Sequence, residues 1–133
     1  MKLFTGIVVV ILVSACGSRT SDENQVRAVI DAAETAAEDR DASDVIDHVT
    51  SDYSDSNGYD RAQLQNFLRA YFLARPKLEL LVRIESLEFP VAGLGRARIA
   101  VNALPSGESA TLDVEFRQEK GEWRVARADR VRQ

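Results

Sequence analysis

Cysteine, histidine, methionine and tryptophan each occur only once in this chain of 133 residues. A single cysteine excludes a disulfide within the chain, so the stability of the domain has to come from its hydrophobic core. With one cysteine and one histidine, protein ligands for zinc are too few, and we expect no metal and no cofactor. A Ser–His–Asp spacing, a phosphate-cradling glycine loop and a nucleotide fingerprint are also lacking, which argues against the enzyme classes that these motifs mark.

The chain also lacks a large excess of either charge, because 21 acidic and 17 basic side chains give a formal net charge of only −4. No basic stripe is present, and nucleic acid is therefore not an expected partner. The charges are nevertheless segregated, with an acidic stretch at 22–60 and a locally basic C-terminal region (Arg124, Arg127, Arg130 and Arg132). Such segregation is typical of solvated faces, and it could equally give head-to-tail complementarity in a dimer.

The only long apolar run of the chain extends from Leu3 to Val13, directly after Lys2. It is shorter than the roughly 20 residues that cross a bilayer, so it indicates a cleaved secretory signal rather than a spanning helix. The run ends in Val13-Ser14-Ala15-Cys16, which resembles the lipobox of bacterial lipoproteins. The resemblance implies that residues 1–15 are removed as a signal peptide and that the thiol of Cys16 receives the lipid anchor.

Gly17 follows the predicted lipidation site. In lipoproteins of enteric bacteria, an aspartate at this position retains the protein in the inner membrane. The resemblance therefore implies a location on the periplasmic face of the cell envelope, at the outer rather than the inner membrane. The alternative is an ordinary signal peptide that leaves a free thiol, which is a liability in an oxidising compartment. After Cys16 we expect a short tether over 16–21 and one domain over 22–133.

The first half of the mature chain has a helical hydrophobic period. Thr20-Ser21-Asp22-Glu23 has capping-box spacing and predicts the start of a first helix, whose apolar positions recur from Val26 to Ala37. A second, short helix is expected over 41–49. A third helix is expected to begin at Asp60, with Gln63 completing its cap, and to end before Pro76.

After Pro76 the hydrophobic period changes to two, which predicts strands. Apolar residues alternate over 80–84 and then over 87–89 in the opposite phase, so a bulge or bend is expected near Glu85-Ser86. Turn residues separate further alternating stretches at 97–103, 112–116 and 123–125. The chain is therefore predicted to be α+β, with three N-terminal helices packed on a curved four-stranded antiparallel sheet.

Two short stretches carry a resemblance to a known superfamily. Gly121-Glu122-Trp123-Arg124-Val125 is similar to the start of the last long strand in nuclear-transport-factor-2-like proteins, and 59–64 is similar to small bacterial lipoproteins of that superfamily. The resemblance covers 22–132 and implies a cone-shaped, cystatin-like fold. The superfamily includes enzymes, binding proteins and dimer scaffolds, so the fold does not choose between these functions.

Enzymes with this fold, such as ketosteroid isomerase, place acid–base residues inside the cone. The nearest candidates here are His48 and Tyr53, with Asp47 and Asp55 beside them, and Asp129 on the last strand. No spacing matches those enzymes residue by residue, so the resemblance assigns no catalytic role. His48 is expected at a helix surface or end, with a pocket base as the alternative.

The last strand contains two charged residues, Arg127 and Asp129, which can contribute to a ligand site only if their side chains point into the cone. Strict alternation after Trp123 would turn Arg127 and Asp129 into the cone, where they could anchor a ligand together with Tyr71 and Trp123. A bulge at Ala126 would instead swap the phase and leave both charged residues in solvent. The sequence leaves both arrangements open.

Three functions follow from these observations. We expect a membrane-anchored, non-catalytic domain that binds a small apolar ligand or a partner in the cell envelope. The second alternative is a general acid–base enzyme for a hydrophobic substrate. The third is a scaffold that forms a weak homodimer through the outward sheet face, whose predicted residues are Arg96, Arg98, Ala100, Asn102, Thr111, Asp113, Glu115 and Arg117.

Overall fold

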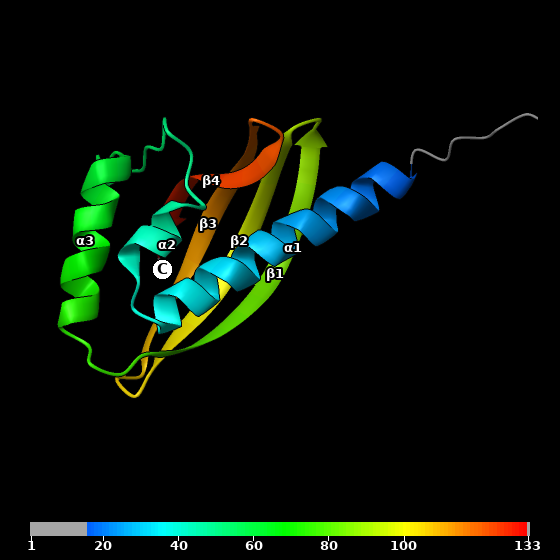
Figure 1. The fold of residues 1–133 in the computed structure, drawn as a ribbon. Coiled ribbons are helices and arrows are strands. Elements are labelled where there is room, and N and C mark those ends of the chain that lie inside the picture. The colour runs from blue at the N-terminus through cyan, green and yellow to red at the C-terminus, as the bar shows by residue number, and fades with distance from the viewer. Residues whose placement is uncertain (1–15, 133) are drawn as a thin grey trace, which may run out of the picture.

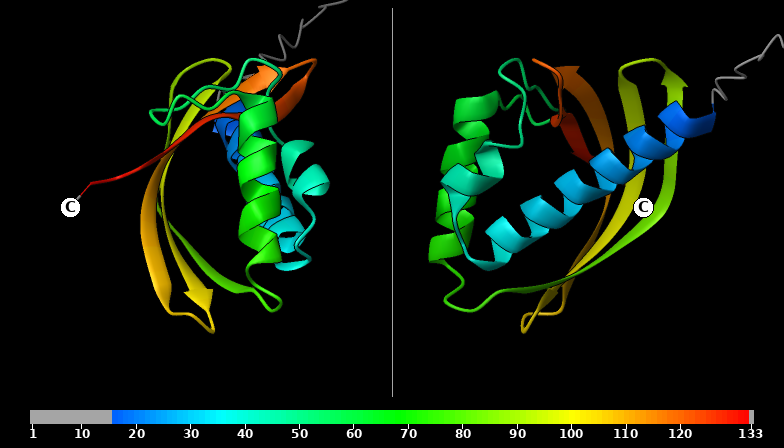
Figure 2. Two further views of the ribbon diagram at one scale, coloured as in Figure 1. Left: turned by 90° about the vertical axis from the view of Figure 1, so that its left-hand side faces the viewer. Right: turned by 45° about the vertical axis from the view of Figure 1, so that its right-hand side comes forward.

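The computed structural model of the chain describes residues 16–132, so the predicted signal peptide (1–15) lies outside the described residues, as does the side chain of Cys16. Its elements are α1 (Cys16–Glu38), α2 (Ala42–Ile46), α3 (Arg61–Leu73), β1 (Glu79–Val91), β2 (Leu94–Leu104), β3 (Glu108–Glu119) and β4 (Glu122–Arg130). The strands form one antiparallel sheet in the order β1-β2-β3-β4. The helices lie on one face of this curved sheet, which confirms the predicted α+β class (Figures 1 and 2).

The first helix begins earlier than its capping-box spacing predicts. α1 begins at Cys16, so the residues expected to form a tether belong to the helix. Side-chain pairs four residues apart stabilise this first part of α1: Gln25 donates to Ser21 and Arg27 forms an ion pair with Glu23. The Ser21 and Glu23 side chains therefore support the surface of a continuing helix instead of capping its start.

The second helix is shorter than predicted because the chain turns to join the sheet. Asp41 caps α2 as expected, with its side chain accepting from the Asp44 amide. The helix ends at Ile46, and Val49 forms an isolated parallel bridge with Val125 of β4. α3 begins with the predicted capping box, in which Asp60 and Gln63 each accept from the other's amide.

The register of the sheet shifts at three points, one of which lies between Glu88 and Val91 at the end of β1. The register of β1 with β2 shifts between Ile84 and Ser86, which confirms the predicted irregularity near Glu85-Ser86. The register of β3 with β4 shifts where Phe116 pairs with Val125 and Glu115 pairs with Arg127. Ala126 is therefore the extra residue of a second bulge.

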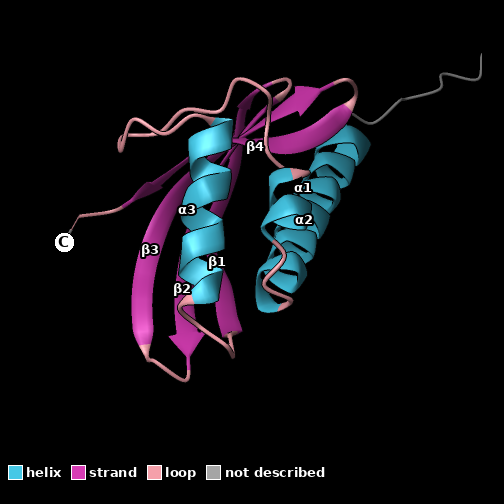
Figure 3. Cartoon of the chain, turned by 60° about the vertical axis from the view of Figure 1, so that its left-hand side comes forward, coloured by secondary structure: helices cyan, strands magenta, loops and turns pink. Residues whose placement is uncertain are grey.

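The main core lies between α1 and the sheet (Figure 3). Val26 and Ile30 of α1 pack with Ile99, Phe116 and Trp123 of the sheet, and the Phe116 side chain is 1% exposed. A second cluster of buried side chains, which Leu64 and Leu68 of α3 cover, consists of Ile46, Val49 and Tyr53. Both clusters reach Val125 of β4, which joins them into one continuous apolar interior.

Candidate functional site

Trp123 and Tyr71, two of the predicted ligand contacts, belong to different surroundings. Trp123 is only 4% exposed and packs edge-on against Phe89, with ring centroids 5.6 Å apart. Its indole N–H has no hydrogen-bond acceptor among the described residues. Tyr71 lies on the rim of α3, where the Arg75 guanidinium stacks 3.6 Å from its ring centroid and its hydroxyl is 3.2 Å from Glu108. Trp123 is therefore a core residue, and Tyr71 joins α3 to the start of β3.

Arg127 and Asp129 lie on the outer face of the sheet, which is the face turned away from the helices, and not inside the cone. The bulge at Ala126 is the reason, because it puts Arg127 opposite Glu115 while Val125 stays opposite the buried Phe116. The two side chains form an ion pair with each other. Strict alternation therefore fails at this point of β4, and the structure has the solvated arrangement.

Three of the catalytic candidates do come together, at the loop between α2 and α3. The hydroxyl of Tyr53 donates to Asp55 at 2.7 Å, and the amide of Ser56 donates to Asp129 at 2.7 Å. The second Asp55 oxygen accepts from the amides of Asn57 and Tyr59. These bonds fix the loop to the end of β4, so the network acts as a structural brace.

The electrostatics of this network do not suit proton transfer near neutral pH. Burial, together with the hydrogen bond to Asp55, raises the pKa of Tyr53 far above its ordinary value of 10.0. Burial would raise the pKa of Asp129, but the Ser56 amide and the Arg127 guanidinium outweigh it and hold that pKa below its ordinary value. Tyr53 therefore stays protonated and Asp129 ionised, whereas a general acid or base works best with a pKa near the operating pH.

The remaining catalytic candidates, Asp47 and His48, lie at the end of α2. Asp47 is exposed and forms the C-cap of the helix through its backbone. His48 is half-buried, and its carbonyl accepts from the Val125 amide at 2.7 Å. The contact that connects His48 to the sheet is therefore made by its main chain.

The outer face of the sheet carries two neighbouring rows of charged residues, which we call the charge ladder. The pairing of neighbouring strands places two rows across the sheet: Glu88, Arg96, Glu115 and Arg127, and beside it Ser86, Arg98, Asp113 and Asp129. Arg98 bonds Asp113 at 2.9 Å, and Arg117 bonds Glu115 at 3.2 Å. The two rows line a groove of about 400 Å³, in which most charges have a partner of opposite sign.

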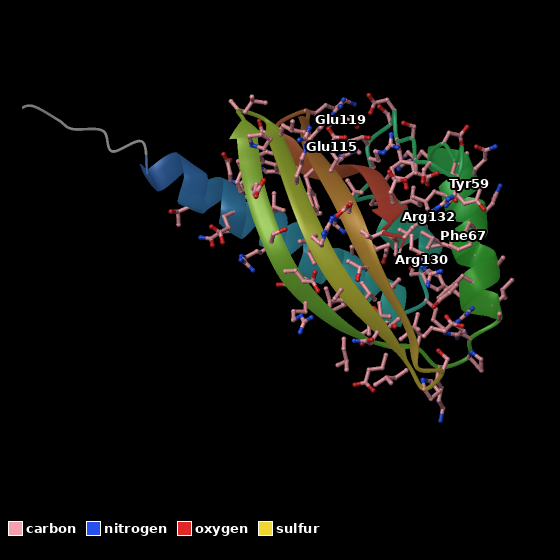
Figure 4. The ribbon with its side chains drawn as sticks, turned by 180° about the vertical axis from the view of Figure 1, so that it is seen from behind. Tyr59, Phe67, Glu115, Glu119, Arg130 and Arg132 are labelled. Atoms are coloured by element: carbon pink, nitrogen blue, oxygen red, sulfur yellow. The ribbon has the colours of Figure 1, made fainter. Side chains whose placement is uncertain are left out.

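A second groove of about 670 Å³ lies beside the charge ladder on the outer face. We call it the arginine groove, and its charged lining is Arg83, Glu85, Arg130 and Arg132. Its polar floor is formed by Asn102, Ser109 and Thr111. In Figure 4, Arg130 and Arg132 lie at the edge of the sheet nearest α3.

The described residues 16–132 show no group of three or more His, Cys, Asp or Glu side chains that could hold a metal ion. Within the same part of the chain, no helix has the length and apolar character needed to cross a membrane.

No protein-family model matches the chain, and no curated protein matches its sequence. Solved structures do match. A protein of unknown function with a cystatin-like fold from Nostoc punctiforme superposes with a TM-score of 0.70 at 14% identity, covering 86% of this chain and 78% of that one. An NTF2-like protein of unknown function from Shewanella baltica gives 0.67 at 12% identity, covering 86% and 97%.

The fold is NTF2-like. A putative scytalone dehydratase from Novosphingobium aromaticivorans also matches, with a TM-score of 0.68 at 10% identity and 86% of both chains covered. At these identities the likeness concerns the fold alone, and NTF2-like neighbours of unknown function stand beside one named as a dehydratase.

The arginine groove is the feature that sequence reasoning missed. The basic character of the C-terminal region is visible in the sequence, and Arg130 and Arg132 are part of it. Arg83 lies far away in sequence and reaches the same groove through the pairing of β1 with β2 and of β2 with β3. Only the sheet register could have joined these residues.

Proposed function

We propose that this protein is a membrane-anchored bacterial lipoprotein whose NTF2-like domain is non-catalytic and binds a partner in the cell envelope through the outer face of its sheet. The lipoprotein part rests on the stretch Val13-Ser14-Ala15-Cys16, with removal of residues 1–15 and lipidation of Cys16. Because α1 begins at Cys16, the anchor would attach directly to a helix of the domain. The location we propose is the periplasmic face of the outer membrane.

One observation carries the binding mode: both grooves described above lie on the outer face, whereas Trp123, Phe116 and Val26 pack the space between α1 and the sheet. The lining of both grooves is rich in charged side chains. A polar macromolecular surface fits such grooves better than a small apolar ligand does, because an apolar ligand would leave the charges unpaired and desolvated.

A second candidate function, a homodimeric scaffold, is favoured by the charge ladder. Its row alternates in sign from Glu88 through Arg96 and Glu115 to Arg127. A second copy related by a two-fold axis can set its arginines opposite these carboxylates. The face is polar, so this dimer would be weak.

The enzyme alternative has less support. A structure named as a putative dehydratase has the same fold. In this chain, however, the Tyr53 hydroxyl donates to Asp55, and Asp129 accepts from the backbone amide of Ser56. Their carboxylates accept backbone amides, which leaves them committed to the brace between the loop and β4.

Lipidation is tested by growing cells with an alkyne-bearing fatty acid and comparing the wild-type chain with Cys16→Ser. We expect label and membrane association only in the wild type, because this is the only cysteine. Label that persists in Cys16→Ser, or a wild-type chain that is never labelled, would contradict the anchor.

Partner binding is tested with a photo-crosslinking amino acid placed in living cells at Arg96 or Arg117 on the outer face. The matched control positions are the exposed residues Gln25 and Asp31 of α1. We expect defined adducts, with one envelope protein or with a second copy, from the outer face and not from the helix. Adducts from α1 alone, or none from either face, would contradict the proposal.

A further inference from the structure

The geometry points to a specific ligand class for the arginine groove: we propose that it binds an acidic glycan, a chain of sugar units that carries carboxylate or phosphate groups. The inference rests on the proposed function in one respect, that the outer face of the sheet is a binding face. It goes further by naming the chemistry of the ligand and the residues that would hold it, which lie outside the charge ladder.

The walls and the floor of the groove come from strands that are adjacent in the sheet. Arg83 pairs with Ala100, and Ala100 pairs with Thr111, so these residues form one row across β1, β2 and β3. The next row contains Asn102 opposite Ser109. The segment after β4 continues the sheet, because the Val131 amide donates to the Thr111 carbonyl at 2.8 Å. Arg132 follows that bond and lies across the groove from Arg83, whereas Arg130 pairs with the core-packed Leu112 and reaches the groove from the edge of the sheet, where it bonds the Ser109 carbonyl.

The charges of this groove are unbalanced, unlike those of the charge ladder beside it. Its charged lining consists of Arg83, Arg130 and Arg132 against Glu85 alone. The excess is positive, although the whole chain carries a formal net charge of −4. A local positive field on a negative protein attracts an anion to this groove.

The arginines are free to exchange their present contacts for a ligand. The Arg83 side chain is 77% exposed and bonds only its neighbour Glu85, and such surface pairs contribute little stability. Arg130 donates to the neutral carbonyl of Ser109. Arg130 also interacts electrostatically with the carboxylate of Glu108. Both oxygens of that carboxylate already accept hydrogen bonds from Arg75, at 2.7 and 2.9 Å. Guanidinium groups suit carboxylate and phosphate because their N–H donors match those oxygens in pairs.

The floor distinguishes a sugar chain from a peptide. Asn102, Ser109 and Thr111 offer amide and hydroxyl groups that can bond the hydroxyls of a sugar. A peptide that adds itself as a strand needs an unpaired sheet edge, and β3 offers one here only over 108–110, beyond its last pair with β4. That edge is short, and the Ser109 carbonyl on it already accepts from the Arg130 side chain. The volume of about 670 Å³ lies within the range of about 300–1,000 Å³ typical of small-molecule sites.

The position of the groove argues against a headgroup in the anchoring leaflet. In Figure 4, the start of α1, to which the anchor would attach, projects from one side of the molecule, while Arg130 and Arg132 lie on the other side. A ligand in the periplasmic space, away from the membrane that holds the anchor, can reach these residues.

The test measures binding of fluorescently labelled trigalacturonate and, separately, glucose 6-phosphate to the purified full chain in detergent micelles. We expect Arg132→Ala and Arg83→Ala each to weaken binding about tenfold, the effect of losing one charge-assisted hydrogen bond. Glu85→Gln should tighten binding several-fold, because Glu85 is the only acidic side chain among the described residues that line the groove. The matched control is Arg117→Ala, which removes an arginine on the outer face but outside the groove. Since these side chains are exposed, circular dichroism should show that all variants remain folded.

Each outcome decides the proposal. Binding of either acid that follows the variants supports it, and the stronger probe identifies carboxylate or phosphate as the acidic group. Equal binding of neutral maltotriose, equal competition by a hexaglutamate peptide, insensitivity to the arginine variants or no binding of either acid would overturn it. The crosslinking test of the proposed function reads a different signal, so a lost glycan site and a lost partner can be told apart.

Discussion

Arg127 of β4 lies directly across from Glu115 of β3, on the face of the sheet that is turned away from the helices. Val125, two residues earlier, lies across from the buried Phe116, so the bulge at Ala126 separates an inward from an outward position. This one extra residue excludes a charged pair from the interior of the cone. It also completes the row of alternating charges on the outer face.

Because the Arg127 side chain points outward and the Phe116 side chain points into the core, we expect substitutions at these two positions to change the stability of the fold very differently. Arg127→Met should leave the urea midpoint of unfolding nearly unchanged, because the side chain is solvated. Phe116→Ala should lower the free energy of unfolding by about 3–5 kcal/mol, because it opens a cavity in the core. Equilibrium urea denaturation measures both, and a large loss in Arg127→Met would contradict the assignment.

The brace between the loop and β4 predicts a modest cost for Tyr53→Phe. Removing the hydroxyl leaves the Asp55 oxygen without its 2.7 Å donor, and we expect a loss of about 1 kcal/mol. The control is Tyr59→Phe, for which no comparable hydroxyl bond holds the loop among the described residues. Equal stability of Tyr53→Phe and the wild type would show that the brace contributes nothing.

The same tyrosine predicts destabilisation at alkaline pH. Burial raises the pKa of Tyr53, and it also raises the pKa of Tyr71, so the folded chain holds both protons when the unfolded chain has begun to lose them. The stabilisation is complete below the ordinary pKa of 10.0 and is lost as the pH rises above it. Urea midpoints measured across this range should fall less in Tyr53→Phe than in the wild type.

Acid should destabilise the protein through three carboxylates. The bonds from Arg75 lower the pKa of Glu108, the backbone amide of Ser51 lowers that of Glu119, and Asp129 is lowered as described above. Because the folded pKa values lie below the unfolded ones, stability is present above the ordinary pKa, which is 4.5 for the two glutamates and 3.8 for Asp129, and is lost as the pH falls below it. Glu108→Gln should flatten this acid limb, and an unchanged limb would contradict the role of the Arg75 pair.

The link between α3 and β3 predicts that lysine cannot replace Arg75. Arg75 stacks on Tyr71 and binds both oxygens of Glu108, and an ammonium group cannot do both with the same geometry. We expect Arg75→Lys to lower the melting temperature by a few degrees, measured by circular dichroism. Full rescue by lysine would reduce the contact to a simple charge pair.

The fold was predictable because its signals are local. Asp60 and Gln63 form the expected cap, and the change of phase near Glu85 appears as a bulge, since side-chain alternation records the backbone directly. The early end of α2 was not predictable, because it depends on Val49 pairing with Val125, which is remote in sequence. A strand bridge of this kind overrides a short helical period.

The arrangement of charges on the outer face of the sheet was predictable only in part. The alternating charges of β2 and β3 follow from the sequence, and Arg98 does pair with Asp113. The direction of the Arg127 side chain depends on the bulge at Ala126, and the sequence was compatible with β4 both with and without that bulge. The arginine groove depends on which residue of β1 pairs with Ala100. Register is set by the whole sheet, so single-strand patterns could not supply it.

Native mass spectrometry of the domain from Ser18 onward, exported to the periplasm and purified without detergent, tests the central claim most directly. An interior packed by Trp123 and Phe116, with binding on the outer face, predicts the bare mass of a monomer or a dimer. Extra mass from a tightly held apolar molecule that disappears on unfolding would contradict it. Such a molecule would place the binding site inside the cone, where it could bond the indole N–H of Trp123, which has no acceptor among residues 16–132.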